Sequence, residues 1–178
     1  MMRIGVLAFL GTAQEHVQIL KSLQVDVVKV KRVEHLHELD GLVLPGGEYS
    51  AIARLIERFG FIEPLKRIAE EIPIWATGAA TALLAEHSIL DLTVLATAQE
   101  SFETSLIVTD VGEDVRAIFI RPPRIVEVGE QVEILSKYED EIVAIRQGWH
   151  IACTFLPELT DDRRFHQLFL SIVKRVKS

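Results

Sequence analysis

Residues 75–80 have the pattern of a strand that runs through a tight turn into a helix, with Gly78 at the centre of the turn. In many hydrolases such a turn presents a nucleophilic side chain above the end of a sheet. A second segment, residues 155–158, has the pattern of a strand end that delivers a base to the same point, and it offers Leu156. The spacing therefore predicts the frame of a catalytic site that lacks both its nucleophile and its base.

Gly78 admits two interpretations. A residue with a Cβ in the sparsely populated backbone region of such a turn costs of order 1–3 kcal/mol, and glycine removes this strain together with the reactive group. The alternative is an ordinary turn glycine with no catalytic ancestry. We favour the lost nucleophile and predict a positive φ at Gly78.

Composition restricts the class of protein. A chain of 178 residues with 49% hydrophobic content is long enough for one domain, which we expect to span residues 1–178. The net charge is −7, and the 19 basic residues are dispersed among 26 acidic ones, which argues against a nucleic-acid partner.

The apolar run at residues 4–10 resembles a short signal peptide, but a buried first strand is the better interpretation of its length. No apolar run approaches the ~20 residues that span a bilayer, so we expect no membrane partner. The single cysteine, Cys153, excludes an internal disulfide. Together these features predict a cytoplasmic protein.

The elements that must position the site alternate in the first half of the chain. Apolar runs predict buried parallel strands, and residues spaced i, i+4, i+7 predict helices between them. Thr12 is placed to cap the first helix. The expected strands are residues 4–9, 25–30, 42–44 and 73–77, and the expected helices are residues 13–20, 51–59, 62–71 and 79–86.

The second half consists mainly of short strands, several of which we expect to pair antiparallel at one edge of the sheet. Thr160 is placed to cap a last helix, with Asp161 and Asp162 in its first turn. The predicted fold is a three-layer α/β/α domain with a mostly parallel, flavodoxin-like sheet and antiparallel edge strands. The expected strands are residues 92–96, 102–109, 117–120, 132–138, 142–146 and 149–155.

Five motifs in order along nearly the whole chain carry a family resemblance. They are IGVL at 4–7, GLVLPGGE at 41–48, FIRPP at 119–123, RQG at 146–148 and PELTDD at 157–162. Together they resemble the glutaminase subunit of pyridoxal 5′-phosphate (vitamin B6) synthase, the PdxT/SNO family of class I glutamine amidotransferases. The resemblance implies a class I glutamine amidotransferase-like fold.

In that family a Cys-His-Glu triad hydrolyses glutamine, and the ammonia passes to a partner barrel subunit. Carried over by position, the resemblance places Gly78 at the nucleophile, Leu156 at the base and Glu158 at the orienting carboxylate. It also implies that the Gly46-Gly47-Glu48 turn supplies backbone N–H groups to an oxyanion and that Arg121 binds the substrate carboxylate. Only Glu158 survives from the triad.

Other departures point the same way. Leu10 and Tyr49 stand where the family has glutamine and serine, and Arg124 stands where it usually has histidine. The stretch 84–99 is shorter than the family pattern at two points. The resemblance alone implies the parental glutaminase activity, and the missing triad members contradict it.

Neither Cys153 nor the histidines replace the missing groups. Cys153 lies within an apolar strand with no histidine beside it, so we expect a buried, protonated and inert thiol. The six histidines form no spaced metal-ligand set, so we expect no metal site. His35 and His37 share a strand-like face beside acidic residues, and solvated surface is the better interpretation. The turn at residues 46–48 lacks the lysine and spacing of a phosphate-binding loop.

Two functional hypotheses follow, neither requiring a cofactor. The first is a catalytically inactive homologue that acts as a scaffold or regulator by binding the synthase barrel subunit or an intact glutaminase paralogue. The second is a sensor of a small amino-acid-like ligand in the vacated pocket, with Arg121 on its carboxylate and Glu48 or Glu158 on its amine. In this second hypothesis Gly78 enlarges the pocket.

Overall fold

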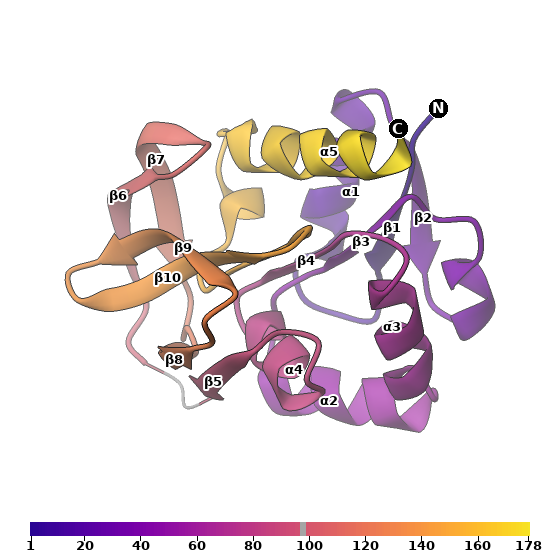
Figure 1. Cartoon of the computed structure of the whole chain (residues 1–178), viewed down its shortest axis with the longest axis horizontal. Helices are drawn as coiled ribbons and strands as arrows, with labels where there is room; N and C mark the ends of the chain where they lie inside the picture. Colours follow the sequence, from indigo (N-terminus) through magenta and orange to yellow (C-terminus); the bar gives the residue numbers. More distant parts are fainter. Residues whose placement is uncertain (97–98) are drawn as a thin grey trace.

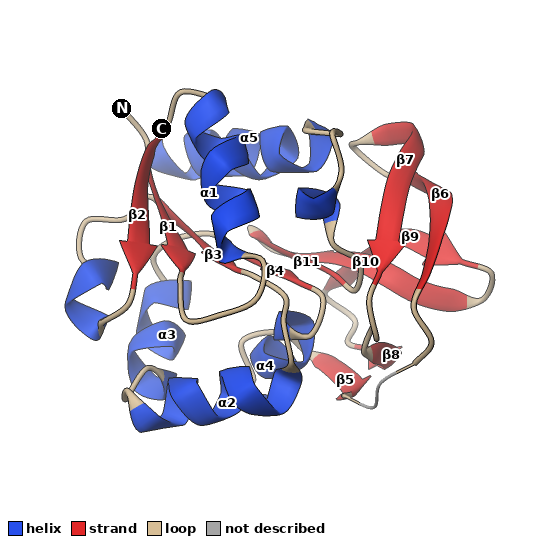
Figure 2. Cartoon of the chain, turned by 180° about the vertical axis from the view of Figure 1, so that it is seen from behind, coloured by secondary structure: helices blue, strands red, loops and turns tan. Residues whose placement is uncertain are grey.

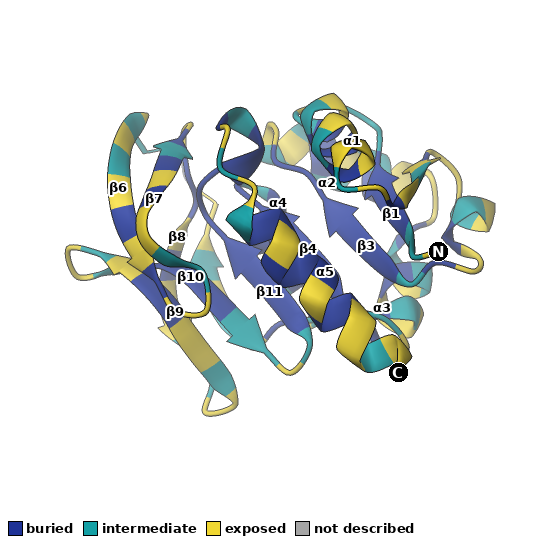
Figure 3. Ribbon diagram, turned by 90° about the horizontal axis from the view of Figure 1, so that it is seen from above, coloured by how far each residue is buried: buried dark blue, intermediate teal, exposed yellow. Residues whose placement is uncertain are grey.

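A parallel sheet forms the centre of the computed structural model, in which residues 1–96 and 99–178 are described. Its strands follow the order β2-β1-β3-β4-β11, and each neighbouring pair is parallel. These strands are β1 (Arg3–Leu7), β2 (Asp26–Val30), β3 (Gly41–Leu44), β4 (Ile74–Thr77) and β11 (His150–Cys153). β3, β4 and β11 are buried throughout, which explains their continuous apolar sequence (Figure 3).

Antiparallel strands extend the sheet beyond β11, as predicted. They are β5 (Leu92–Leu95), β8 (Arg124–Val128), β9 (Val132–Tyr138) and β10 (Glu141–Gln147), with β9 paired to β10. A separate two-stranded sheet consists of β6 (Phe102–Val108) and β7 (Gly112–Phe119). The end of the shortened stretch 84–99 includes residues 97 and 98, which lie outside the described residues.

Helices cover both faces of the sheet and complete the three layers (Figures 1 and 2). α1 (Ala13–Ser22) and α5 (Arg164–Lys177) pack on one face. α2 (Tyr49–Arg58), α3 (Ile62–Ala69) and α4 (Ala80–Glu86) pack on the other. The structure thus confirms the predicted fold class. Within the described residues, no helix combines the length and apolar character needed to cross a bilayer.

Several local predictions were wrong. β8 was missed because its mostly exposed residues and the preceding Pro122-Pro123 resembled a loop. β7 begins five residues before the expected strand. His35 and His37 were expected to share a strand-like face. Instead His35 lies in a 3-10 helix, η1 (Val33–Leu36), and His37 follows it.

The caps predicted for the first and last helices were also wrong. Thr12 makes no side-chain capping bond to α1; its hydroxyl instead donates to Glu158 Oε1 at 2.6 Å. α5 begins only at Arg164, whose N–H donates to Asp162 Oδ1 at 3.0 Å. The Thr160 hydroxyl accepts from the Asp162 N–H and helps shape the turn after η2 (Pro157–Leu159).

Candidate functional site

The turn between β4 and α4 is built around Gly78, which has a φ of +54°. Its N–H donates to the Cys153 carbonyl at 2.8 Å, and its own carbonyl accepts from the Thr81 N–H. The first of these bonds ties the turn to the end of β11, and the second closes the turn into α4. The predicted positive φ is confirmed.

Leu156 closes the space above this turn. Its Cδ2 atom lies 2.8 Å from the position that a Cβ on Gly78 would occupy, and 2.5 Å from the corresponding position on Gly46. Leu156 is itself only 5% exposed, so its side chain forms part of the core. The expectation that Gly78 enlarges a pocket was therefore wrong, because leucine fills the space that a smaller residue at 78 leaves free.

Glu158 is buried beneath the turn, and its carboxylate contacts three side chains. Its Oε1 accepts hydrogen bonds from Thr12 Oγ1 at 2.6 Å and from Thr77 Oγ1 at 2.9 Å. Its Oε2 lies 3.3 Å from His16 Nε2. Burial raises the pKa of Glu158, but the charge and hydrogen bond of His16 and the Thr12 hydroxyl outweigh burial and hold that pKa below its usual value. The carboxylate is thus stabilised as an anion inside the protein.

A second histidine extends this buried cluster. His16 Nδ1 lies 2.9 Å from His166 Nε2, and both rings pack edge-on against the indole of Trp75. Burial, followed by the neighbouring His16 and Arg163, lowers the pKa of His166 to about 2, so this ring is neutral. We call Glu158, His16 and His166 the buried triplet.

Glu158 was singled out from the sequence, but its partners His16 and His166 were not. His16 lies between Ala13 and Leu20 on the apolar stripe of α1, and His166 lies beside Phe165 on that of α5. A histidine on an apolar helix face is the signal that could have placed both rings in the core.

In the Gly46-Gly47-Glu48 turn, Gly46 is buried, whereas Gly47 and Glu48 are exposed. The Gly46 N–H donates to Thr77 Oγ1 at 3.0 Å, so this group is already satisfied. The Glu48 carboxylate caps α2 by accepting from the backbone N–H groups of Ser50 and Ala51. The hydrogen bond from the Ser50 hydroxyl, then these backbone bonds, lower the pKa of Glu48.

A cavity of about 340 Å³ lies at the mouth of this region. Arg121 contributes to it from an uncommon backbone conformation, with a φ of +44° and its N–H bonded to the Ser101 hydroxyl. The structure therefore brings Glu48 and Arg121 to one cavity, whereas Glu158 does not line it. The lining residues are Gly47, Glu48, Tyr49, Ala79, Ala96, Ile120, Arg121 and Pro123.

Cys153 is buried, as predicted, and has no solvent-exposed surface. Burial and then the nearby Glu158 charge raise the pKa of this thiol well above its usual value. A protonated, inaccessible thiol is a poor nucleophile. Cys153 therefore cannot take the place of the group missing at Gly78.

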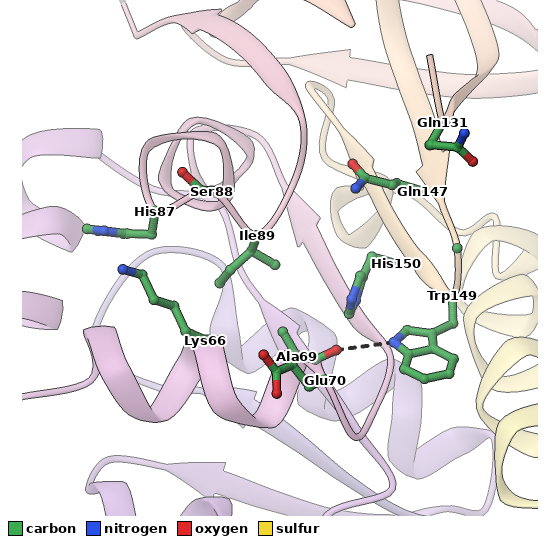
Figure 4. Close-up of a pocket in the computed structure, with 11 residues that line it drawn as sticks. Lys66, Ala69, Glu70, His87, Ser88, Ile89, Gln131, Gln147, Trp149 and His150 are labelled. Atoms are coloured by element: carbon green, nitrogen blue, oxygen red, sulfur yellow. Dashed lines mark hydrogen bonds between the residues drawn. The ribbon is translucent and has the colours of Figure 1, made fainter. Parts of the chain in front are cut away.

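A larger cavity, of about 690 Å³, lies at the other end of the sheet (Figure 4). Its floor includes His150, the first residue of β11, whereas Gly78 follows the last residue of the parallel neighbour β4. The cavity is thus separate from the candidate site by the length of these strands.

Comparisons with known proteins agree with this architecture. The model of the SNO glutamine amidotransferase family matches residues 6–175. A solved structure described as a glutamine amidotransferase superposes with a TM-score of 0.89 at 34% identity, covering 96% of this chain and 98% of that one.

Two curated relatives are each described as pyridoxal 5′-phosphate synthase subunit PdxT. The protein from Halalkalibacterium halodurans is 50% identical over 192 residues, covering 100% of this chain and 98% of the relative. The protein from a Geobacillus species is 46% identical over 192 residues, covering 100% of both chains. Both alignments are longer than the 178 residues of this chain, so the relatives carry residues that this chain lacks. This chain belongs to the SNO glutamine amidotransferase family.

Proposed function

We propose that this chain is a catalytically inactive member of its family that acts by binding a protein partner. The observation that carries the proposal is the packing of Leu156 onto Gly78. A thiol at residue 78 and an imidazole at residue 156 are both absent, and the leucine fills the volume in which they would meet.

The chemistry supports inactivity on independent grounds. Removing the nucleophile or the base of a catalytic triad costs about 10⁶ in rate, and removing both costs little more because they act as a unit. The one thiol in the chain is buried and protonated. Within the described residues, no other cysteine is available to replace it.

The relatives suggest the kind of partner. They are named as subunits of pyridoxal 5′-phosphate synthase, and this chain aligns with them along its whole length. We infer that it binds the barrel subunit of that synthase, or an intact glutaminase copy, and acts as a scaffold or regulator.

Co-expression with the barrel subunit followed by gel filtration tests the inference. We expect co-migration whether or not glutamine is present, because no glutamine-dependent chemistry is available to this chain. An intact Cys-His-Glu family member serves as the positive control for complex formation. Separate elution of this chain from both the barrel subunit and the intact glutaminase would contradict the proposal.

A sensor of a small amino-acid-like ligand is the second candidate, and the 340 Å³ cavity with its strained Arg121 favours it. Because the Glu48 carboxylate already caps α2, Arg121 would carry most of the recognition. A thermal-shift screen of amino acids tests this, since a ligand that binds the folded state raises its midpoint. The shift should disappear in Arg121→Gln and persist in the control Arg67→Gln.

A further inference from the structure

Four separate segments border the 690 Å³ cavity, as Figure 4 shows. They are the end of α3, the loop after α4, the turn between β10 and β11, and Gln131 in the loop between β8 and β9. Its volume falls within the ~300–1,000 Å³ range of small-molecule sites. The residues used below are Lys66, Glu70, Ile89, Gln147, Trp149 and His150.

His150 presents a fixed donor at the floor of the cavity. Its Nδ1 accepts a hydrogen bond from the Ile74 N–H at 3.0 Å, so the ring proton of the neutral tautomer must reside on Nε2. Burial lowers the pKa of His150 to about 4, so the ring is neutral at pH 7. The side chain that lines the cavity is therefore an uncharged imidazole whose Nε2–H donates to the Ala69 carbonyl.

The Gln147 side chain is also held so that its donor group is the free end. Its Oε1 accepts from the Asp91 N–H at 2.7 Å, which leaves its NH₂ group as the free end. Figure 4 shows Gln147 and His150 on the same side of the cavity. In both residues a backbone N–H occupies the accepting atom, so two side chains that could donate or accept are both restricted to donating.

Four other residues give the cavity an apolar wall and two charged side chains. The Trp149 indole is held in place by a bond from its Nε1 to the Ala69 carbonyl at 3.3 Å, and Ile89 lies across the cavity. Lys66 brings a cation whose only ion pair within the described residues is an exposed contact with Glu63 at 3.4 Å. Glu70 is the one acidic residue of the lining.

From this arrangement we propose that the cavity is a binding site for a small organic carboxylate. The carboxylate oxygens would accept from the free Gln147 amide and would share the His150 Nε2–H with the Ala69 carbonyl, with Lys66 providing charge compensation. The carbon chain would lie against Trp149 and Ile89, and Glu70 would pair an amino group in ligands that carry one. This site is independent of the candidate site at Gly78 and of the proposed partner binding.

Protein NMR with succinate, L-glutamate and L-glutamine as probes tests the proposal. The chain has two tryptophans, so the Trp149 indole N–H reports on the cavity and the fully buried Trp75 indole is an internal control. Saturable movement of the Trp149 signal alone, below about 10 mM of at least one probe, is the expected result.

Gln147→Glu is the decisive variant because its carboxylate can still accept from the Asp91 N–H while the free donor becomes an acceptor. We expect it to weaken binding about tenfold or more. Gln167→Glu, on the exposed face of α5, adds the same charge away from the cavity and should leave affinity unchanged. If Gln147→Glu fails to fold, Lys66→Gln replaces it. Absence of saturable movement with every probe, or equal affinity in the cavity variant and the control, would overturn the proposal.

Discussion

The Leu156 side chain occupies the space directly above Gly78, with its Cδ2 atom 2.8 Å from where a Cβ on that glycine would lie. The two residues come from different segments, the β4–α4 turn and the residue that precedes η2. Their contact explains how the protein keeps a well-packed core at a point where its family has a reactive centre. It also means that neither position can be changed without affecting the other.

Substitution of Gly78 by alanine should therefore destabilise the fold through two effects. The left-handed backbone costs a residue with a Cβ about 1–2 kcal/mol, and contact with Leu156 adds about 1–3 kcal/mol of overpacking. Gly60→Ala is the matched control, because Gly60 has a similar φ of +68° and no atom within 4 Å of its Cβ position.

Urea unfolding of Gly78→Ala, Leu156→Ala and the double variant separates these effects. The double variant should be more stable than the sum of the single changes implies, since each relieves the crowding or the cavity caused by the other. The contact would contribute nothing to stability if the losses of unfolding free energy in the two single variants simply added in the double variant. The same conclusion would follow if Gly78→Ala destabilised the fold no more than Gly60→Ala.

Neutralising Glu158 should be strongly destabilising. Glu158→Gln removes a buried negative charge that accepts from the Thr12 and Thr77 hydroxyls, and hydrogen bonds to a charged group contribute about 1.5–3 kcal/mol. Glu63→Gln, whose pair with Lys66 is exposed, should change stability by less than about 1 kcal/mol. Equal unfolding midpoints for the two variants at pH 7 would show that the buried Glu158 carboxylate contributes no more to stability than the exposed Glu63.

The thiol of Cys153 should resist modification in the native protein. Burial and the Glu158 charge raise its pKa, so little thiolate forms even at pH 8. Mass spectrometry after iodoacetamide treatment should detect no adduct on the folded chain and one adduct in concentrated urea. Rapid alkylation without denaturant would mean that the thiol is accessible and that a substitute nucleophile must be considered.

His150 should make stability depend on pH. Its pKa is about 4 in the folded chain and 6.5 as the unperturbed value, so between these limits the unfolded state binds more protons. The contribution of His150 is complete above pH 6.5 and is lost as pH falls toward 4, at about 1.4 kcal/mol per pH unit.

Urea titrations at pH 7.5 and pH 5.5 measure this effect. His150→Gln keeps an oxygen able to accept from the Ile74 N–H and should lose less stability between the two pH values than the wild type. His37→Gln, at an exposed position, should retain the wild-type pH dependence. Identical pH dependence in all three proteins would exclude His150 as a buried neutral group.

The central strands could be predicted from the sequence because each is buried on both faces. Residues 4–9 and 42–44 are nearly continuous apolar runs, and the bounds of β1 and β3 lie within two residues of them. β8 follows two prolines and has a single buried residue, Ile125, so its pattern was compatible with a loop. Thr160 and Asp162 are both good capping residues two positions apart, and only the structure shows that Asp162 bonds the first N–H of α5.

The positive φ of Gly78 also followed from its place in a strand-to-helix turn. The buried triplet could not be predicted in the same way, since His16 and His166 are 150 positions apart and meet only when α1 and α5 pack on the same face. The direction of the Leu156 side chain also depends on long-range packing, so it could not be predicted from the sequence. That direction determines whether the space above Gly78 is open or filled.

Release of glutamate from glutamine by the purified chain, alone and mixed with the barrel subunit of pyridoxal 5′-phosphate synthase, tests the central claim most directly. An intact Cys-His-Glu family member under the same conditions provides the reference rate. With both the thiol and the imidazole absent and Leu156 packed onto Gly78, we predict no glutamate above the protein-free blank in either mixture, consistent with a loss of about 10⁶ in rate. Release by this chain that approaches the reference rate would contradict the assignment of a catalytically inactive family member.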